Sequence, residues 1–271
     1  MSRLCLIALM LFLLSTVEAQ QFKVDTLYSG LKNPTSLLIA NDAIYVVEQG
    51  NHRVLKLDLN GNLIEKYGNR GSGNYQFDSP TDIASSTGLK IFISDPGNNR
   101  IQVFDKRWQY LSSIKANNQF ESGSEITPSH LGVNKFGEVI FYNETTKVLG
   151  KYNEDGAYLD QIPIPSDIKD VSGLQVSDSK IFILDKKSEL IHRLSENGFY
   201  ESFYEAKRTG SFFYRKNEIF GVKNDAIEKQ GALTKKLIFS LEKKSEVNDL
   251  YVDESKFYIL TSYVLIRILE E

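Results

Sequence analysis

The residues Ile91-Phe92-Ile93-Ser94 form a short apolar strand motif that returns at intervals along the chain. The other five copies are residues 44–47 (IYVV), 139–142 (VIFY), 181–184 (IFIL), 219–222 (IFGV) and 257–260 (FYIL). The second residues of successive copies are 47, 48, 42, 38 and 38 positions apart. Six related units of this length are typical of a repeat architecture.

Each unit divides into four strands separated by turns. In the first unit we expect these strands at residues 35–40, 43–48, 53–58 and 63–67. Between the third and fourth strands the chain has Asn60-Gly61, and the equivalent places have Asp155-Gly156 and Asn197-Gly198. Glycine and asparagine accept the positive φ that a tight hairpin turn needs. The second unit has Asp105-Lys106-Arg107-Trp108 there, so we expect a longer or differently built turn.

The sixth unit has no fourth strand of its own, because its third strand at residues 264–269 is followed only by the last residues of the sequence. The alternating segment at residues 22–28 can supply the missing strand and close a ring, which leaves no open junction between units. The fold class predicted is therefore all-β: one six-bladed β-propeller of four-stranded antiparallel blades over residues 20–271. The alternatives are an open array of hairpins, or a helix within residues 229–246, where the fifth unit is least regular.

The first 19 residues have the three parts of a secretory signal peptide. Arg3 supplies a positive charge, residues 4–14 are apolar, and we expect cleavage after Ala19. A membrane anchor, the alternative, needs about 20 apolar residues to cross the hydrocarbon core. The sequence therefore predicts a secreted or periplasmic protein without a membrane span. Cys5 lies in this segment, so the mature chain has no cysteine for a disulfide, a thiol nucleophile or a metal thiolate.

Composition and charge narrow the function classes. The chain is 41% hydrophobic, which is enough to bury a core. Its 32 lysines and arginines against 35 acidic residues give a net charge of -3, and such a charge exerts no general attraction on nucleic acids or anionic lipids. Lysines 235, 236, 243 and 244 cluster in the fifth unit, where lysines at sheet edges typically prevent unwanted pairing. We expect no nucleic-acid partner and a monomer.

The second unit carries a set of motifs that is specific in combination. They are the glycine-rich loop at residues 68–73, the step from Gln76-Phe77 to Pro80, and Asp95 followed by Asn98 and Arg100. In these motifs the unit resembles the NHL family of β-propellers. The first unit and part of the third repeat the motifs, and the last three units keep only the strand rhythm. The resemblance in fold therefore covers the whole mature chain. The resemblance in motif residues covers only about residues 33–133.

Two pairs of charged motif residues have a structural interpretation. We expect Asp95 to pair with Arg100, and Glu48 with Arg53, across the loop between the second and third strands of their units. These ion pairs would brace the blades. In addition, Asn143-Glu144-Thr145 matches the glycosylation acceptor pattern, which has meaning only if the source is a eukaryote.

The candidate site is a ring of residues around the central channel. We aligned the units on the first apolar residue of the innermost strand. The residues just before it are Ser36, Asp82, His130, Gly173, Ser211 and Asp249. Two carboxylates and an imidazole can hold a divalent cation, calcium or zinc, or act as acid and base. Asp82, His130 and Asp249 are thus metal candidates, and Ser36 and Ser211 complete the candidate ligand-binding set.

The alternative for this ring is a solvated channel mouth with a hydrogen-bonded histidine. No catalytic residue is assigned, and no cofactor is expected apart from the possible cation. The function that the sequence favours is a non-catalytic binding or scaffolding module that presents a propeller face to a protein or glycan partner. Tyr75, Phe77 and Trp108 lie in or near loops where aromatic residues can anchor a partner, although an apolar residue at a strand start, such as Phe77, is more typical of a core.

Likeness to secreted six-bladed enzymes implies a second function, a metal-dependent lactonase or lyase with its site at the channel. A zinc lyase of that kind has several channel histidines. This chain has His52, His130 and His192, of which only His130 is placed for the channel. A lactonase of that kind has a glutamate as well as aspartate and asparagine, and here only Asp82, Asp249 and the neighbouring Asn248 are available.

Overall fold

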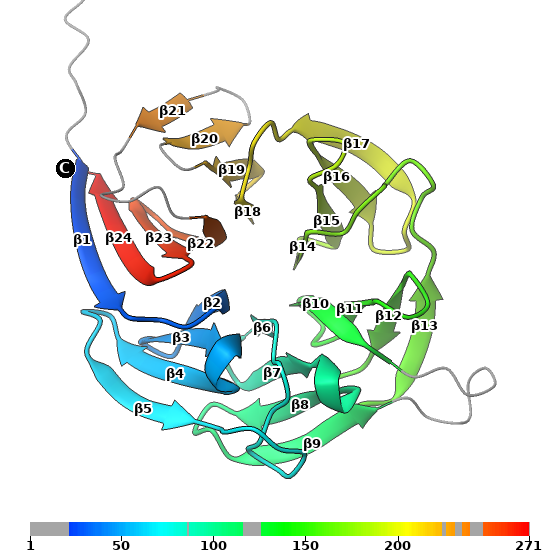
Figure 1. The fold of residues 1–271 in the computed structure, drawn as a ribbon. Coiled ribbons are helices and arrows are strands. Elements are labelled where there is room, and N and C mark those ends of the chain that lie inside the picture. Colours follow the sequence, from blue (N-terminus) through cyan, green and yellow to red (C-terminus); the bar gives the residue numbers. More distant parts are fainter. Residues whose placement is uncertain are drawn as a thin grey trace, which may run out of the picture.

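The structure is a computed structural model that describes residues 22–85, 87–115, 126–223, 226–230, 235–238 and 246–270. Six four-stranded antiparallel sheets stand around a central channel like the blades of a propeller (Figure 1). The predicted fold class is therefore confirmed. Residues 1–19, with Cys5, lie outside the described residues, as do Lys243 and Lys244. The described residues form no helix long and apolar enough to cross a membrane.

The strands follow one another from the channel outward in each blade. Blade 1 contains β2 (Pro34–Ala40), β3 (Ala43–Glu48), β4 (Arg53–Asp58) and β5 (Leu63–Tyr67). Blade 2 contains β6 (Ile83–Ala84), β7 (Lys90–Asp95), β8 (Arg100–Asp105) and β9 (Tyr110–Lys115). Blade 3 contains β10 (Pro128–Val133), β11 (Val139–Asn143), β12 (Val148–Tyr152) and β13 (Tyr158–Ile162).

The other three blades repeat this order. Blade 4 contains β14 (Gly173–Ser177), β15 (Lys180–Asp185), β16 (Leu190–Ser195) and β17 (Tyr200–Glu205). Blade 5 contains β18 (Ser211–Arg215), β19 (Glu218–Val222), β20 (Ala226–Gln230) and β21 (Lys235–Ile238). Blade 6 contains β22 (Val247–Asp253), β23 (Lys256–Thr261), β24 (Val264–Glu270) and, as its outer strand, β1 (Phe22–Ser29). Two short 3-10 turns, η1 (Gln49–Asn51) and η2 (Pro96–Asn98), join strands in blades 1 and 2.

The ring closes through the N-terminal strand, as predicted. β1 pairs antiparallel with β24 from Phe22 opposite Glu270 to Ser29 opposite Val264. The Arg267 side chain strengthens this closure, because its guanidinium lies 2.9 Å from the Asp25 carboxylate and also donates to the Leu59 carbonyl of blade 1. The last blade is thus built from both ends of the described chain.

The second strand of each blade is almost entirely buried, because both of its faces pack against neighbouring blades. All six residues of β3 are buried, for example. Near-continuous apolar runs are the expected pattern for strands covered on both faces. Each junction between blades holds a cluster of buried apolar side chains. At the junction of blades 1 and 2, Trp108 stacks on Tyr45, Tyr67 and Phe104 and is 3% exposed.

The outer hairpin turns differ in one respect from expectation. Gly61, Gly156 and Gly198 have positive φ values, but the Asn or Asp before each does not. The turn is followed by a one-residue bulge in the outer strand, so only one position needs a left-handed conformation. Blade 2 builds the same turn with Trp108 at that position (φ 65°), and Trp108 N–H donates to the Asp105 carbonyl. Of the two predicted alternatives, a longer or a differently built turn, the turn is not longer; it differs in having Trp108, whose indole is stacked, at the position where the other turns have glycine.

The predicted ion pairs of the loops are present. Arg100 Nε lies 2.8 Å from Asp95 Oδ2, and Arg53 pairs with Glu48. The Asp95 carboxylate also accepts from the backbone N–H of Asp78, which ties the loop between blades to blade 2. Glu48, Asn143 and Asp185 make the equivalent bond to the loops that precede blades 1, 3 and 4.

This role also bears on the glycosylation pattern at Asn143. The Asn143 side chain is 5% exposed, and its Oδ1 accepts from the N–H groups of Thr127 and Thr145. A glycan would be attached to Nδ2 of this buried amide, where the surrounding side chains leave it little room. The folded chain therefore does not present Asn143 as an open acceptor.

The Asp95–Arg100 pair leads to a stability prediction. Both side chains are almost fully buried, and Arg100 also donates to the carbonyls of Ser72, Gly73 and Gln76. We expect Arg100→Ala to lower the free energy of unfolding by about 3–5 kcal/mol, because it leaves a buried carboxylate without its partner. Urea unfolding followed by Trp108 fluorescence measures this loss. Arg53→Ala is the matched control, with a smaller expected loss because Arg53 is 25% exposed; equal losses would contradict the prediction.

Candidate functional site

The channel is a cavity of about 690 Å³ lined by the innermost strands of all six blades. Each innermost strand has a hydrogen-bonded neighbour on its outer side only, so its other edge faces the channel. Backbone groups at such an edge need hydrogen-bond partners from side chains or from water. We therefore expect polar side chains at the channel to bond first to these backbone groups.

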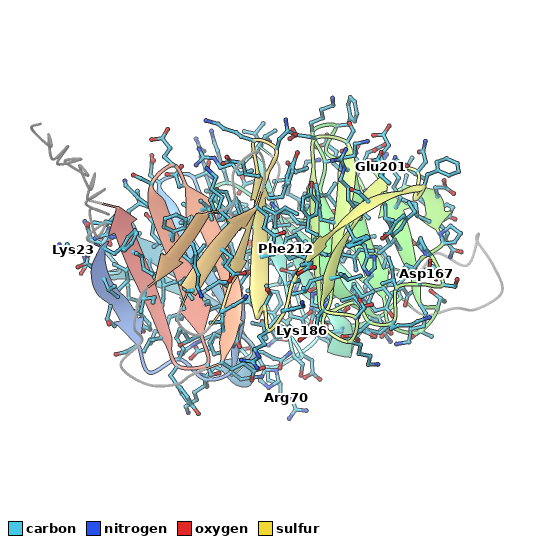
Figure 2. The ribbon with its side chains drawn as sticks, turned by 90° about the horizontal axis from the view of Figure 1, so that it is seen from above. Lys23, Arg70, Asp167, Lys186, Glu201 and Phe212 are labelled. Atoms are coloured by element: carbon cyan, nitrogen blue, oxygen red, sulfur yellow. The ribbon has the colours of Figure 1, made fainter. Side chains whose placement is uncertain are left out.

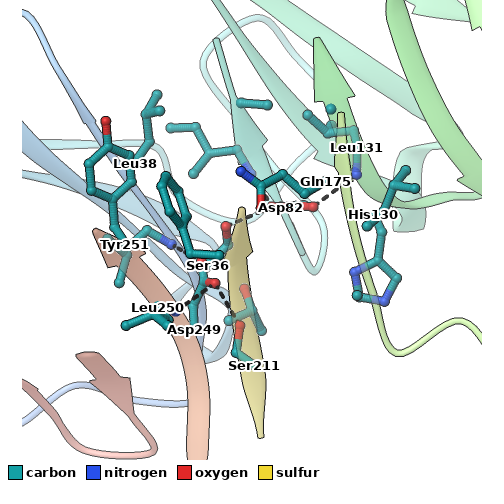
Figure 3. A pocket seen from close by; sticks show the side chains of 18 of the residues that line it. Ser36, Leu38, Asp82, His130, Leu131, Gln175, Ser211, Asp249, Leu250 and Tyr251 are labelled. Carbon is teal, nitrogen blue, oxygen red and sulfur yellow. Dashed lines mark hydrogen bonds between the residues drawn. The ribbon is translucent and has the colours of Figure 1, made fainter. Parts of the chain in front are cut away.

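All six residues of the predicted ring line this cavity. The ring is not, however, a set of free ligands. Its polar side chains form hydrogen bonds from one blade to the next (Figure 3). We call the connected group of Ser36, Asp82, Ser211 and Asp249 the inner clasp.

The Asp249 carboxyl group joins three blades. Its Oδ2 accepts from the Leu37 N–H of blade 1 at 2.8 Å, and its Oδ1 accepts from the Ser211 hydroxyl of blade 5 at 3.1 Å. The N–H of Leu250, the next residue in its own blade, also donates to Oδ1. Asp249 therefore closes the ring on the channel side, while β1 and β24 close it at the rim.

The Asp82 carboxyl group repeats this arrangement one blade further round. Its Oδ2 accepts from the Leu131 N–H of blade 3 at 2.8 Å, and its Oδ1 accepts from the Ser36 hydroxyl of blade 1 at 2.6 Å. The N–H of Ile83 also donates to Oδ1. Each of the two carboxyl groups thus has three hydrogen-bond donors before any ligand is considered.

Sequence analysis missed Gln175 and Thr81 and named Asn248 only for the lactonase alternative, yet these three residues make the equivalent bonds elsewhere. Gln175 of blade 4 accepts from the Tyr214 N–H of blade 5 at 2.6 Å and donates to the Tyr214 carbonyl at 3.1 Å. Asn248 donates to the Pro34 carbonyl, and Thr81 to the Ser129 carbonyl. These residues do not all lie at the ring position. The sequence could have indicated these residues if every polar residue of an innermost strand had been considered. The alignment considered one position in each blade and so passed over them.

The three histidines lie apart from one another. His130 lines the channel beside blade 4. His52 lies in a loop, where its Nδ1 accepts from the Ser79 N–H at 2.9 Å. His192 is buried at 2% exposure and contacts the Tyr200 hydroxyl. His130 is therefore the one channel histidine, but none of the bonds of the inner clasp includes it.

Burial changes the acidity of these groups. It raises the pKa of Asp82 to about 7 and that of Asp249 to about 6, because a carboxylate is poorly solvated at these positions. The hydrogen bonds that each carboxyl accepts oppose this effect, and the charge of Asp249 adds to it at Asp82. Burial also lowers the pKa of His130, which favours its neutral form.

The predicted cation set is not assembled by this geometry. Across the described part of the chain, no three His, Cys, Asp or Glu side chains lie close enough to hold one ion. Ser36 bonds to Asp82 on one side, whereas His130 lies on the other side of Asp82 in the channel (Figure 3). A cation at either carboxyl group would compete with backbone N–H donors of the neighbouring blade.

Comparison with known proteins finds relatives for part of the chain. No family model matches the chain. Human NHL repeat-containing protein 3 is 32% identical over 78 residues, which are 27% of this chain and 22% of that protein. Rat E3 ubiquitin-protein ligase NHLRC1 is 30% identical over 105 residues, which are 38% of this chain and 26% of that protein. The matches thus span about a quarter of the length of these relatives.

The six-bladed ring and these two relatives point in the same direction. By fold the chain is a six-bladed β-propeller, and over the matched segments it is similar to NHL-repeat proteins. Among solved structures, the propeller is similar to a streptogramin B lyase (TM-score 0.68, 12% identity, 92% of this chain and 98% of that one). It is also similar to the gluconolactonase XC5397 of Xanthomonas campestris (TM-score 0.70, 12% identity, 95% and 93%). At this identity the likeness shows the fold alone.

The raised carboxyl pKa values predict how the stability of the propeller depends on pH. Between pH 4 and 7 the folded chain holds protons on Asp82 and Asp249 that the unfolded chain, with carboxyl pKa values near 3.8, releases. Stability from this source is therefore lost as pH rises through that window. We expect Asp82→Asn to remove about 2–4 kcal/mol of the difference in unfolding free energy between pH 5 and pH 8. Urea unfolding at the two pH values measures this.

The matched control is Asp253→Asn. Asp253 lies in the same blade as Asp249, but its side chain is 51% exposed and paired with Arg215. Its substitution is expected to leave the pH dependence as in the wild type. If Asp82→Asn behaved in the same way as this control, burial at the channel would not govern the protonation of Asp82.

Proposed function

We propose that this NHL propeller is an exported, non-catalytic binding module that holds an extended segment of a partner protein. The observation that supports this proposal is a concentration of exposed aromatic rings on blade 4. Phe199, Tyr200 and Phe203 are 73%, 44% and 55% exposed within five consecutive residues. Single exposed apolar residues are ordinary on a protein surface, but three exposed aromatic residues within one strand and its turn point to an interaction site. We call these three residues the blade-4 surface.

The blade-4 surface borders an open strand edge. Among the described strands, β17 pairs with β16 alone, so its outer N–H and C=O groups face away from the blade. An extended peptide can add to such an edge through main-chain hydrogen bonds while its side chains contact the exposed rings. Natural edge strands more often carry lysines that discourage pairing. β17 carries glutamates and aromatic residues in place of lysines.

Charge and size indicate the kind of partner. Asp167 lies close enough to Tyr200 to act on its hydroxyl, and within the described residues it has no ion pair. Glu205 is 71% exposed as well, but it is already paired with Lys207 at 3.6 Å, so Asp167 is the acidic group available to a partner. With about 200 Å² for each ring, the blade-4 surface offers roughly 350 Å², less than half of the about 800 Å² that each partner contributes to a stable dimer. A short segment with apolar and basic side chains therefore fits better than a second copy of the chain.

The aromatic anchors proposed here differ from those expected from the sequence. Phe77 and Trp108 are buried in the junction of blades 1 and 2, so Phe77 is a core residue as predicted and Trp108 is no anchor. Tyr75 is 39% exposed, but its ring packs near Phe104 and its hydroxyl accepts from the Tyr110 N–H. These bonds give Tyr75 a local structural role.

The lactonase or lyase alternative draws support from the fold likeness to two such enzymes. A channel ligand of that kind would have to share or displace the hydrogen bonds that Asp82 and Asp249 make between blades. A partner at the blade-4 surface displaces no such bond. For this reason we favour binding over catalysis. The proposal of export rests on the signal-peptide features of residues 1–19.

A site-specific cross-linking experiment tests the binding proposal. A photo-reactive phenylalanine analogue at Phe203 is compared with the same analogue at Phe136, which is 65% exposed on another blade. We expect a defined protein segment from the exported fraction to cross-link at position 203 and not at 136. That segment, synthesised as a peptide, is expected to bind the wild type and to lose at least tenfold in affinity, about 1.4 kcal/mol, with Phe203→Ser but not with Phe136→Ser.

Three outcomes would contradict the proposal. Equal cross-linking at the two positions would show that the blade-4 surface is not specific. A peptide whose affinity Phe203→Ser leaves unchanged would place the contact elsewhere. Binding of glycans alone on a glycan array, again lost with Phe203→Ser, would keep the surface but replace the protein partner.

A further inference from the structure

Trp108, the single tryptophan of the chain, lies at the junction of blades 1 and 2 and is stacked among three other rings. The ring centroids of Tyr67, Phe104 and Tyr45 lie 4.2, 5.0 and 5.4 Å from that of Trp108. The indole Nε1–H is buried and, within the residues that the structure describes, has no hydrogen-bond acceptor. Packing alone gives no reason for an unpaired indole N–H, and buried groups of this kind can have a redox role.

The composition of the chain makes this indole important for oxidation. Cysteine thiols and methionine thioethers are common sites of oxidation in proteins. Met1, Cys5 and Met10 are the sulfur-containing residues of the sequence, and all three precede residue 20. Among the side chains of residues 20–271, indole and phenol groups therefore lose an electron most readily. One-electron oxidation of this part of the chain falls on Trp108 and the tyrosines.

The two tyrosines stacked on Trp108 differ in whether they can release a proton. A phenol oxidised at neutral pH loses its proton together with the electron. The Tyr45 hydroxyl is buried without a hydrogen-bond partner among the described residues, and the Lys56 ammonium group, 5.7 Å from the ring centroid, opposes a positive charge there. The Tyr67 hydroxyl, in contrast, donates to Glu65 Oε2 at 2.6 Å. Tyr67 is therefore the stacked ring that can be oxidised.

The position of Tyr67 connects the buried indole with the surface. Tyr67 ends β5, the outer strand of blade 1, whose other four residues are exposed. Partial burial and the Glu65 charge raise the pKa of Tyr67, so the phenol keeps its proton until its ring is oxidised. The indole has no acceptor to which it could lose its own proton. An oxidised Trp108 therefore stays a radical cation, which is a strong enough oxidant to take an electron from Tyr67.

We propose that Trp108, Tyr67 and Glu65 form an electron relay that makes Tyr67 the site of oxidative modification of the propeller. A one-electron oxidant takes an electron from Trp108. An electron from Tyr67 restores Trp108, while the phenol proton passes to Glu65 and then to water. The neutral tyrosyl radical couples with a second phenol radical, formed by loss of one electron and one proton, through one carbon–carbon bond. The ring hydrogens at the joined carbons move to the phenol oxygens, so no further electron is needed.

The relay is independent of the binding function proposed above. Blade 1, which carries Tyr67, lies across the channel from blade 4 (Figure 1). Figure 2 likewise shows Lys23 of β1, in the blade next to blade 1, and Glu201 of β17 at opposite sides of the molecule. A partner at the blade-4 surface therefore leaves Tyr67 uncovered.

Laser photoionisation of the wild-type chain tests the relay directly. A pulse at the red edge of the indole absorption removes an electron from Trp108 without exciting tyrosine, and hexaamminecobalt(III) in solution takes up this electron. We expect the tryptophan radical to decay as a tyrosyl radical appears, which transient absorption follows through their separate visible bands. In Tyr67→Phe the stacked ring stays but has no hydroxyl. We expect the transfer to slow roughly tenfold or more, which is about 1.4 kcal/mol in the barrier.

Two further variants separate the parts of the relay. Tyr45→Phe is the matched control, because it removes the hydroxyl of the other stacked tyrosine, and it is expected to leave the transfer rate unchanged. Glu65→Gln is expected to slow the transfer, because an amide is a weak proton acceptor. An unchanged rate in Tyr67→Phe would overturn the relay. An unchanged rate in Glu65→Gln would overturn the role of Glu65 as the proton acceptor.

Trapping of the radical tests the modification site. The same pulse is given with 2-methyl-2-nitrosopropane present, a nitroso compound whose nitrogen bonds to a tyrosyl ring carbon. Peptide mass mapping is expected to find the adduct at Tyr67 and not at Tyr263, which is 62% exposed but lies outside the relay. Equal trapping at the two tyrosines would show that exposure selects the modified residue, and would overturn the proposal.

Discussion

The innermost edge of each blade is the constraint on which the channel depends. A propeller strand next to the channel has a hydrogen-bonding neighbour on one side only, and its free N–H groups must find acceptors. In this chain a side chain of the neighbouring blade supplies such an acceptor. Asp249 accepts from Leu37, Asp82 accepts from Leu131, and Gln175 accepts from Tyr214. The same bonds that satisfy the backbone thereby join the blades.

A second set of hydrogen bonds also joins neighbouring blades, at the loops that lead from one blade into the next. In blades 1 to 4 the residue at the end of the second strand, such as Asp95 or Asp185, accepts from the backbone of the loop that leads into its blade. Together the two sets fix each blade to its neighbours on the inner and the loop side, while apolar clusters fill the space between. The NHL motif residues therefore describe a way of joining blades. Asp185 keeps this bond in blade 4. Within the described residues, blades 5 and 6 do not have it, but side chains such as Gln175 and Asp249 make the junctions there.

Most of the fold could be predicted from the sequence, because strand rhythm and turn residues are local. The four strands of blade 1 match the expected ranges to within one residue, and β1 pairs where the ring needed a strand. The turn at Trp108 could not be predicted, since the energy that holds its positive φ comes from rings of another blade. The candidate ring was located by alignment, but the bonding within it was not. Alignment places residues around a channel without showing that Asp82 bonds to blade 3 and Ser36 to blade 2.

The difference between the ring and the blade-4 surface follows from the same physics. Polar residues at the channel are needed by the backbone, so their presence alone says little about a ligand. The rings of Phe199 and Phe203 satisfy no backbone group and bury little surface, so the fold does not require them where they lie. An exposed aromatic residue that the fold does not need lowers solubility and invites edge pairing. These aromatic residues lower solubility and do not stabilise the fold. Binding of a partner therefore explains their presence better than the stability of the propeller does.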